Sequence, residues 1–253
     1  MIHSILLIGQ SNMAGRGFVK EAVPVDGTHV KVLRNGRWQP FYRPINNDRS
    51  FSGVCLGESF AEAYAKAYGV EAGLIPCADG GTRLDQWMPG EILFENAVNC
   101  TRLAQRTSTV AAILWHQGES DCGDPLLRAT YRARFEAMIS ALREACDLHD
   151  VPVLLGGLGD FLPIHNEAWY GQGNAAALNE ILRQMAEETP LTGFVSAEGL
   201  TANPDNLHFN APSLHTFGLR YYEAYEKNKD ESKVFPTDDI ALRDLPRTAL
   251  EKL

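Results

Sequence analysis

Short apolar runs alternate along the chain with longer segments in which apolar residues recur every three or four positions. The apolar runs are residues 5–8, 72–76, 110–115, 151–155 and 193–196. The segments with helical spacing are 58–68, 92–106, 125–146, 174–188 and 212–225. Near-continuous aliphatic runs are typical of strands buried on both faces, and the helical segments each present one apolar face. The alternation predicts an α/β fold with a central parallel sheet wrapped by helices.

Two segments depart from this alternation. Residues 16–53 contain Asn35-Gly36 between apolar runs, a pair typical of a two-residue hairpin turn, so we expect an insertion over the sheet edge or the mouth of a site. Residues 227–253 are charge-rich and weakly patterned, which predicts an ordered strap or a partly disordered extension. The 253 residues are enough for one large α/β domain with a substantial core, so we expect a single domain over residues 1–253, with two small domains as the alternative that length alone leaves open.

The charge balance narrows the class of partner. The 253 residues include 32 Asp and Glu against 23 Lys and Arg, a net charge of -9, so a nucleic acid or an anionic membrane would meet excess carboxylates. No apolar run is long enough to span a bilayer, and no signal peptide fits before the first strand. The five cysteines form no C-x-x-C pair and are interpreted as mostly buried, reduced thiols. These features predict a cytoplasmic protein that binds a neutral or modestly charged ligand.

Polar clusters follow several predicted strands, where the carboxyl ends of a parallel sheet form a ligand crevice. After the first strand, Gly9 allows a sharp turn, and Ser11 would either raise its hydroxyl above the sheet or simply cap a helix. After the second, Gly80 and Gly81 would either point a backbone N–H into a site or only form a turn.

The third cluster begins with His116 and ends with Cys122. Four of its side chains could ligate a metal, but their spacing matches no standard zinc pattern, so no metal is predicted. In the interpretation that we prefer, Gln117 donates a side-chain N–H to an oxyanion, while Glu119 and Asp121 brace the loop.

A carboxylate and an imidazole occur together late in the chain. Asp205 precedes His208 by three residues, so it could accept a hydrogen bond from Nδ1 and leave Nε2 free to act as a base. A surface loop with an incidental histidine is the alternative. Nucleophile, acid and histidine in this order form one of the known chain orders of a serine triad.

Together these motifs resemble the sialate O-acetylesterase-like branch of the SGNH hydrolases, which includes the acetylxylan esterases of carbohydrate esterase family six. The matching residues are Gly9-Gln10-Ser11-Asn12-Met13, Gly80-Gly81-Thr82, Trp115-His116-Gln117-Gly118-Glu119 and Asp205-x-x-His208-Phe209. The resemblance covers residues 3 to 225 approximately. It implies a three-layer flavodoxin-like fold and serine esterase chemistry without a metal or cofactor.

By this resemblance Ser11 is the nucleophile, His208 the base and Asp205 its orienting partner. The implied oxyanion donors are the N–H of Ser11, the N–H of Gly80 or Gly81 and the Gln117 side chain. The implied loop supports are Gln10, Asn12 and Glu119. The substrate would be an acetylated sugar or oligosaccharide, with the sugar and the acetylated hydroxyl left open.

Three residues are candidates for contact with the sugar. Trp87 and Trp169 could stack on a pyranose, and Arg83 stands where the family commonly has smaller residues. Trp115, at a strand end, is expected to belong to the core. Two other function classes stay open: a carbohydrate-binding module without catalysis, and a flavodoxin-like nucleotide or flavin site on residues 9–17.

Overall fold

The computed structural model describes residues 1–233 and residue 235, and its centre is a seven-stranded sheet. The strands are β1 (Ile2–Gly9), β2 (Val30–Arg34), β3 (Arg37–Pro40), β4 (Glu71–Pro76), β5 (Thr109–His116), β6 (Val153–Gly156) and β7 (Thr192–Val195). Their order is β3-β2-β4-β1-β5-β6-β7, and every neighbouring pair is parallel except β2 with β3. The predicted α/β class with a mostly parallel central sheet is confirmed.

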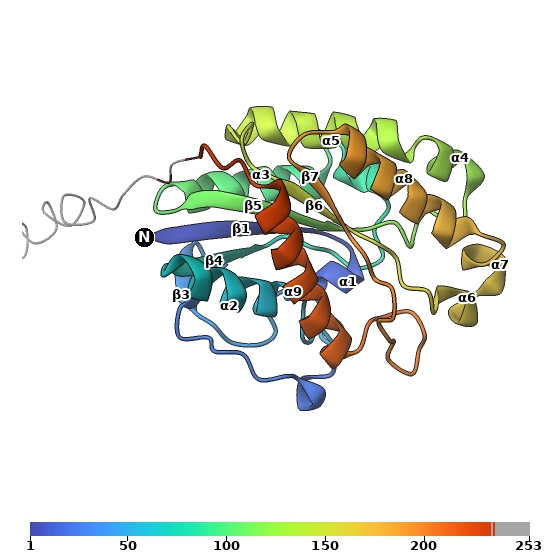
Figure 1. Ribbon diagram of the computed structural model, residues 1–253, viewed down its shortest axis with the longest axis horizontal. Coiled ribbons are helices and arrows are strands. Elements are labelled where there is room, and N and C mark those ends of the chain that lie inside the picture. The colour runs from blue at the N-terminus through green and yellow to red at the C-terminus, as the bar shows by residue number, and fades with distance from the viewer. Residues whose placement is uncertain (234, 236–253) are drawn as a thin grey trace, which may run out of the picture.

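Helices cover both faces of this sheet. The longer ones are α2 (Gly57–Tyr68), α3 (Ile92–Gln105), α5 (Tyr131–Cys146), α8 (Asn174–Glu188) and α9 (Ala211–Asn228). The shorter ones are α1 (Ser11–Ala14), α4 (Pro125–Ala129), α6 (Leu162–His165) and α7 (Glu167–Tyr170), with 3₁₀ turns η1 (Val19–Glu21) and η2 (Leu84–Trp87). Figure 1 shows α3, α5 and α8 on one face and α2 and α9 on the other. Each face buries its own apolar core, so the fold has three layers.

The predicted hairpin joins β2 to β3 and widens the sheet at one edge. Its turn residues Asn35 and Gly36 have φ angles of 50° and 75°, the positive values that a type I′ turn requires. Strand β2 also pairs with β4, with Val32 opposite Leu74. The insertion therefore contributes two strands before the chain returns toward the carboxyl end of β4.

The prediction of a single helix over residues 125–146 is wrong, because the structure has two helices there, α4 and α5, which are separated at Thr130. The carbonyl of Leu126 accepts the Thr130 hydroxyl at 2.8 Å, and the carbonyl of Leu127 accepts Nη2 of Arg134 at 2.7 Å. The Leu126 carbonyl also accepts the N–H of Thr130 at 3.1 Å, so it keeps its helical bond, whereas the Leu127 carbonyl in the last turn of α4 has the Arg134 side chain as a partner.

The predicted C-terminal extension over residues 227–253 begins inside α9, which ends at Asn228. Its residues 234 and 236–253 lie outside the described residues. In the part of the chain that the structure describes, no helix is both long enough and apolar enough to cross a membrane.

Candidate active site

The nucleophile candidate stands where β1 ends beside β5. Gly9 has a φ of 127°, and a Cβ there would collide with the carbonyl of His116, so the close approach of the strand ends requires glycine. The N–H of Gln10 donates to that carbonyl at 2.8 Å. The chain then enters α1, whose first residue is Ser11. Ser11 is buried but keeps 7% of its surface exposed to solvent.

Ser11, His208 and Asp205 lie in one hydrogen-bonded line. The distance from Ser11 Oγ to His208 Nε2 is 3.0 Å, and that from His208 Nδ1 to Asp205 Oδ2 is 2.7 Å. The other carboxylate oxygen, Oδ1, accepts the backbone N–H groups of Leu207 and His208, each at 3.0 Å. This arrangement suits an imidazole that is protonated at Nδ1 and faces the serine hydroxyl with Nε2.

The Asp205 carboxyl remains ionised despite partial burial. Burial by itself raises the pKa of this carboxyl. Hydrogen bonds from the N–H groups of Leu207 and His208 and from the His208 ring lower the pKa by more than burial raises it, so the pKa lies below its ordinary value. His165 also holds this loop, since its Nδ1 lies 2.8 Å from the carbonyl of Asp205. The loop therefore presents a negative charge to the imidazole at neutral pH.

The buried Asn12 side chain connects the nucleophile loop to two other loops. Its Nδ2 lies 2.6 Å from Glu119 Oε1 and 3.3 Å from the carbonyl of Leu207, and its Oδ1 accepts the N–H of Phe209 at 3.1 Å. One amide thus links the segments that carry Ser11, Glu119 and His208.

Gln10 supports the same region through its side-chain oxygen. Oε1 accepts the backbone N–H groups of Gly118 and Ser120 at 3.4 and 3.3 Å, and it lies 3.3 Å from Nε2 of Gln117. Gln10 therefore ties the start of α1 to the loop after β5.

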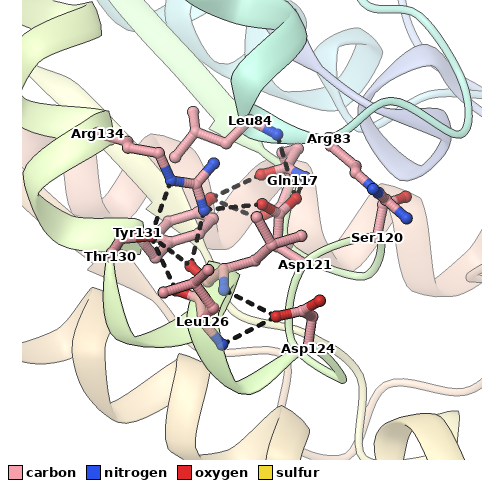
Figure 2. A network of polar contacts seen from close by, with 12 residues as sticks. Arg83, Leu84, Gln117, Ser120, Asp121, Asp124, Leu126, Thr130, Tyr131 and Arg134 are labelled. Atoms are coloured by element: carbon pink, nitrogen blue, oxygen red, sulfur yellow. Dashed lines mark hydrogen bonds and ion pairs between the residues drawn. The ribbon is translucent and has the colours of Figure 1, made fainter.

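Gln117 is fully buried, and its side-chain amide is consumed by contacts inside the protein. Nε2 donates to Asp121 Oδ2 at 2.6 Å and to the carbonyl of Thr82 at 3.1 Å, while Oε1 accepts the Tyr131 hydroxyl at 2.9 Å. Figure 2 shows the amide directed toward Asp121. The prediction that Gln117 donates to an oxyanion is contradicted, because an amide nitrogen carries only two hydrogens.

The acidic residues of this loop also have protein partners. Asp121 Oδ1 accepts Nη2 of Arg134 at 3.0 Å and Oδ2 accepts the N–H of Leu84 at 3.1 Å (Figure 2). Glu119 Oε1 lies 3.0 Å from Nε2 of His116. Among the described residues, no three His, Cys, Asp or Glu side chains are grouped as metal ligands. The polar side chains of Gln117, Glu119 and Asp121 in the loop after β5 are therefore buried and bonded within the protein.

The two glycines after β4 differ in their backbone partners. The N–H of Gly80 donates to Asp48 Oδ2 at 2.9 Å and is therefore not free for a ligand. Within the described part of the chain, the N–H groups of Gly81 and Ser11 make no hydrogen bond. Of the two glycine N–H groups that the sequence left open, only that of Gly81 is available.

Trp87 does not reach the surface, so the prediction that it contacts a sugar is wrong. The residue is 1% exposed, and its ring meets that of Trp115 edge to face at a centroid distance of 5.6 Å. Its Nε1 lies 3.1 Å from the Thr82 hydroxyl. Trp115 is buried in the core, as the sequence predicted.

Arg83 and Trp169 border a surface cavity of about 320 Å³ beside the glycine loop. Gly81 and Ser120 line the same cavity, and Nε1 of Trp169 donates to the carbonyl of Glu119 at 2.8 Å. Of the three side chains predicted to contact a sugar, Arg83 and Trp169 therefore share one cavity. Its wall includes Gly81, whose N–H makes no hydrogen bond within the described residues.

Sequence reasoning missed the residues that hold the glycine loop from outside. Asp48 and Arg49, in the insertion, both contact Gly80, although 31 or more residues separate them in the chain. Arg16, which follows α1, pairs with Asp48 at 2.6 Å. The only sequence signal was the position of Arg16 directly after the nucleophile segment.

The chain is similar to known carbohydrate esterases. A family model described as carbohydrate esterase, sialic acid-specific acetylesterase, matches residues 2–227. The chain is 29% identical over 248 residues to the probable carbohydrate esterase At4g34215 of Arabidopsis thaliana, covering 88% of this chain and 90% of that protein.

Solved structures show the same fold. The X-ray structure of the Arabidopsis protein matches with a TM-score of 0.79 at 27% identity, over 90% of this chain and 99% of that one. A carbohydrate acetylesterase from Xanthomonas citri matches with a TM-score of 0.65 at 20% identity, over 89% of this chain and 56% of that one. Because the family model spans most of its length, the chain belongs to the carbohydrate esterase family of the sialic acid-specific acetylesterases, with the fold of the SGNH hydrolases.

Proposed function

We propose that the protein is a serine esterase that removes O-acetyl groups from carbohydrates through an acyl-enzyme. The observation that carries the proposal is the continuous line from Ser11 Oγ through both ring nitrogens of His208 to Asp205, with distances of 3.0 and 2.7 Å. A hydroxyl, a base and an orienting carboxylate in this geometry form an activated nucleophile.

In the acylation step, His208 Nε2 takes the proton of Ser11 as Oγ attacks the acetyl carbonyl carbon. The carbonyl oxygen becomes an oxyanion, and the N–H groups of Ser11 and Gly81 are its proposed donors. When the tetrahedral intermediate collapses, the bond to the sugar oxygen breaks and His208 returns the proton to that oxygen. The products are an acetylated Ser11 and a free sugar hydroxyl.

In the deacylation step, water replaces the sugar. His208 takes a proton from water, the resulting hydroxide attacks the acetyl carbon, and the same N–H groups stabilise the second oxyanion. Acetate leaves as Ser11 Oγ recovers its proton. Throughout the cycle, Asp205 stabilises the imidazolium and keeps the ring oriented, because its carboxylate accepts from Nδ1.

The leaving sugar is proposed to occupy the cavity beside Gly81. The partly exposed Trp169 ring offers a stacking surface, and Arg83 offers hydrogen-bond donors to sugar oxygens. Acetylated xylo-oligosaccharides and O-acetylated sialic acids are the two substrate types to compare first.

The test is acetate release from a panel containing an activated acetyl ester, an acetylated xylo-oligosaccharide and an O-acetyl sialic acid. Wild type is compared with Ser11→Ala and with Ser140→Ala, a control at an exposed position of α5. We expect release by wild type and the control, ranked by sugar, and none by Ser11→Ala. Equal release by Ser11→Ala would reject Ser11 as the nucleophile, and no release from any substrate would favour a carbohydrate-binding protein without catalysis.

A further inference from the structure

Two consecutive residues of the insertion contact both polar backbone groups of Gly80. Asp48 Oδ2 accepts the N–H of Gly80 at 2.9 Å, and Nη2 of Arg49 donates to its carbonyl at 2.8 Å. Arg49 also reaches Asp79 Oδ1 at 3.0 Å and the carbonyl of Asp48 at 2.7 Å. We call Asp48 and Arg49 the Gly80 clamp.

The contact with the Gly80 carbonyl has a consequence for the next residue. The carbonyl of Gly80 and the N–H of Gly81 belong to one planar trans peptide, so they point in opposite directions. A donor that holds the carbonyl on one side therefore holds the N–H on the other. This N–H belongs to the glycine whose backbone donor is unpaired within the described residues.

Without such a contact, this peptide could adopt more than one orientation. Glycine on both sides of the bond permits backbone angles that other residues rarely adopt, and Gly81 has a φ of 78°. A Cβ on Gly81 would meet nothing within 4 Å, so no neighbouring atom crowds that side of Gly81. If the peptide flipped, a carbonyl oxygen would replace the N–H, and it would repel a developing oxyanion.

The clamp is anchored to the segment that carries the nucleophile. Asp48 accepts Nη1 and Nη2 of Arg16 at 3.2 and 2.6 Å and the Ser52 hydroxyl at 2.8 Å, and the side chains of Arg16 and Asp48 are 5% and 3% exposed. Nη1 of Arg16 also donates to the carbonyl of Gly15, directly after α1. A Cβ on Gly80 would lie 3.4 Å from Cβ of Ser11, so the clamped residue and the nucleophile are neighbours.

We propose that Arg49 is a positioning residue for catalysis, which orients the Gly80–Gly81 peptide so that the N–H of Gly81 faces the oxyanion. The proposal rests on the proposed function. Arg49 acts through the peptide and not by contact with the substrate. Its side chain is 40% exposed and its ion pair with Asp79 is at the surface, so it contributes little to folding stability.

The test compares Arg49→Met with Arg106→Met, a control at an exposed arginine after α3. Two quantities are measured on each protein: kcat and KM for the activated acetyl ester, and the rate at which diethyl p-nitrophenyl phosphate phosphorylates the active-site serine. The phosphoryl oxygen of this reagent must occupy the oxyanion site, so its reaction rate reports on the donors independently of acetyl transfer.

For Arg49→Met we expect kcat to fall about tenfold or more with KM nearly unchanged, and phosphorylation to slow by a similar factor, since losing one oxyanion donor costs about 10² to 10³ in kcat. Arg106→Met should match wild type in both assays. A kcat for Arg49→Met equal to the control, or a lower kcat with unchanged phosphorylation, would overturn the proposal.

The Ser11→Ala variant separates this proposal from the proposed function. If Ser11→Ala abolishes acetate release while Arg49→Met behaves like its control, the serine esterase stands and the role of Arg49 fails. If Ser11→Ala hydrolyses as fast as wild type, the proposed function fails, and the role of Arg49 fails with it.

Discussion

Two loops at the carboxyl edge of the sheet carry aspartates with opposite surroundings. In the loop between β7 and α9, the Asp205 side chain is 43% exposed and holds an imidazole whose other nitrogen faces Ser11. In the loop after β5, Asp121 is fully buried, and it bonds to Gln117 and Arg134.

In our proposal the loop that carries Asp205 takes part in the reaction and the loop that carries Asp121 supports it. Both loops are rich in polar groups and follow a strand, so neither feature separates them. The amide of Gln117 is consumed inside the protein, whereas the imidazole of His208 is held by one nitrogen and leaves the other beside a hydroxyl. The hydrogen-bonding capacity that a loop leaves unused, and not its polar content, indicates where chemistry occurs.

The strongest test of this comparison is Asp205→Asn. The amide would present a donor to Nδ1, which favours the wrong tautomer and leaves a proton on Nε2 facing Ser11. We expect kcat to fall roughly 10³- to 10⁴-fold, the upper value being the loss caused by the same change in a serine-protease triad, while Tm changes little. Steady-state kinetics on an activated acetyl ester and thermal unfolding measure the two effects. A near-normal kcat would refute the assignment of the triad.

The same substitution in the buried loop should act on stability. Asp121→Asn removes the charge that faces Arg134 and one acceptor for buried donors, so we expect a loss of about 3 kcal/mol in the free energy of unfolding. The kcat of the folded fraction should stay within about tenfold of wild type, since in our proposal Asp121 does not touch the reacting atoms.

Urea denaturation measures the stability change, with Asp124→Asn as the control. Asp124 caps α4 in the same region, and asparagine caps a helix about as well as aspartate. If Asp121→Asn kept its stability and lost activity as Asp205→Asn should, the loop after β5 would be catalytic and the comparison would fail.

Replacing Glu119 is expected to cause a smaller loss of folding stability, and the size of this loss should depend on pH. Burial by itself raises the pKa of this carboxyl. The imidazole of His116 and the amide of Asn12 lower the pKa by more than burial raises it, so the pKa lies below its ordinary value. Such a group stabilises the fold above the pKa that it has in the unfolded chain, about 4.3, and this stabilisation is lost as pH falls through the folded-state pKa.

We therefore expect Glu119→Gln to lower the free energy of unfolding by about 1 to 3 kcal/mol at neutral pH, because buried hydrogen bonds to a charged acceptor are weakened. The difference from wild type should shrink as the pH is lowered below about 4. Urea denaturation at a series of pH values measures it. A difference that grows on acidification would mean that Glu119 is not held as a carboxylate.

The sheet and its helices could be predicted because each element carries its own periodicity. The helix over residues 174–188 was predicted with its observed bounds, and strands β1, β4 and β5 extend the predicted runs by a few residues at most. The break at Thr130 could not be predicted. It depends on Arg134, one turn further on, which bonds to a carbonyl of the preceding helix and to Asp121 on another loop.

The chain by itself determined where chemistry could occur. Parallel strands end at one edge of the sheet, so the segments after them, including those of Ser11 and His208, had to meet there. The tertiary structure alone decided which polar atoms remain free, since burial and partners depend on residues far apart in sequence. It enclosed Gln117 and Trp87, and it brought Arg49 onto the carbonyl of Gly80. A residue type indicates what a side chain can bond to, but only packing determines which of those bonds are already made.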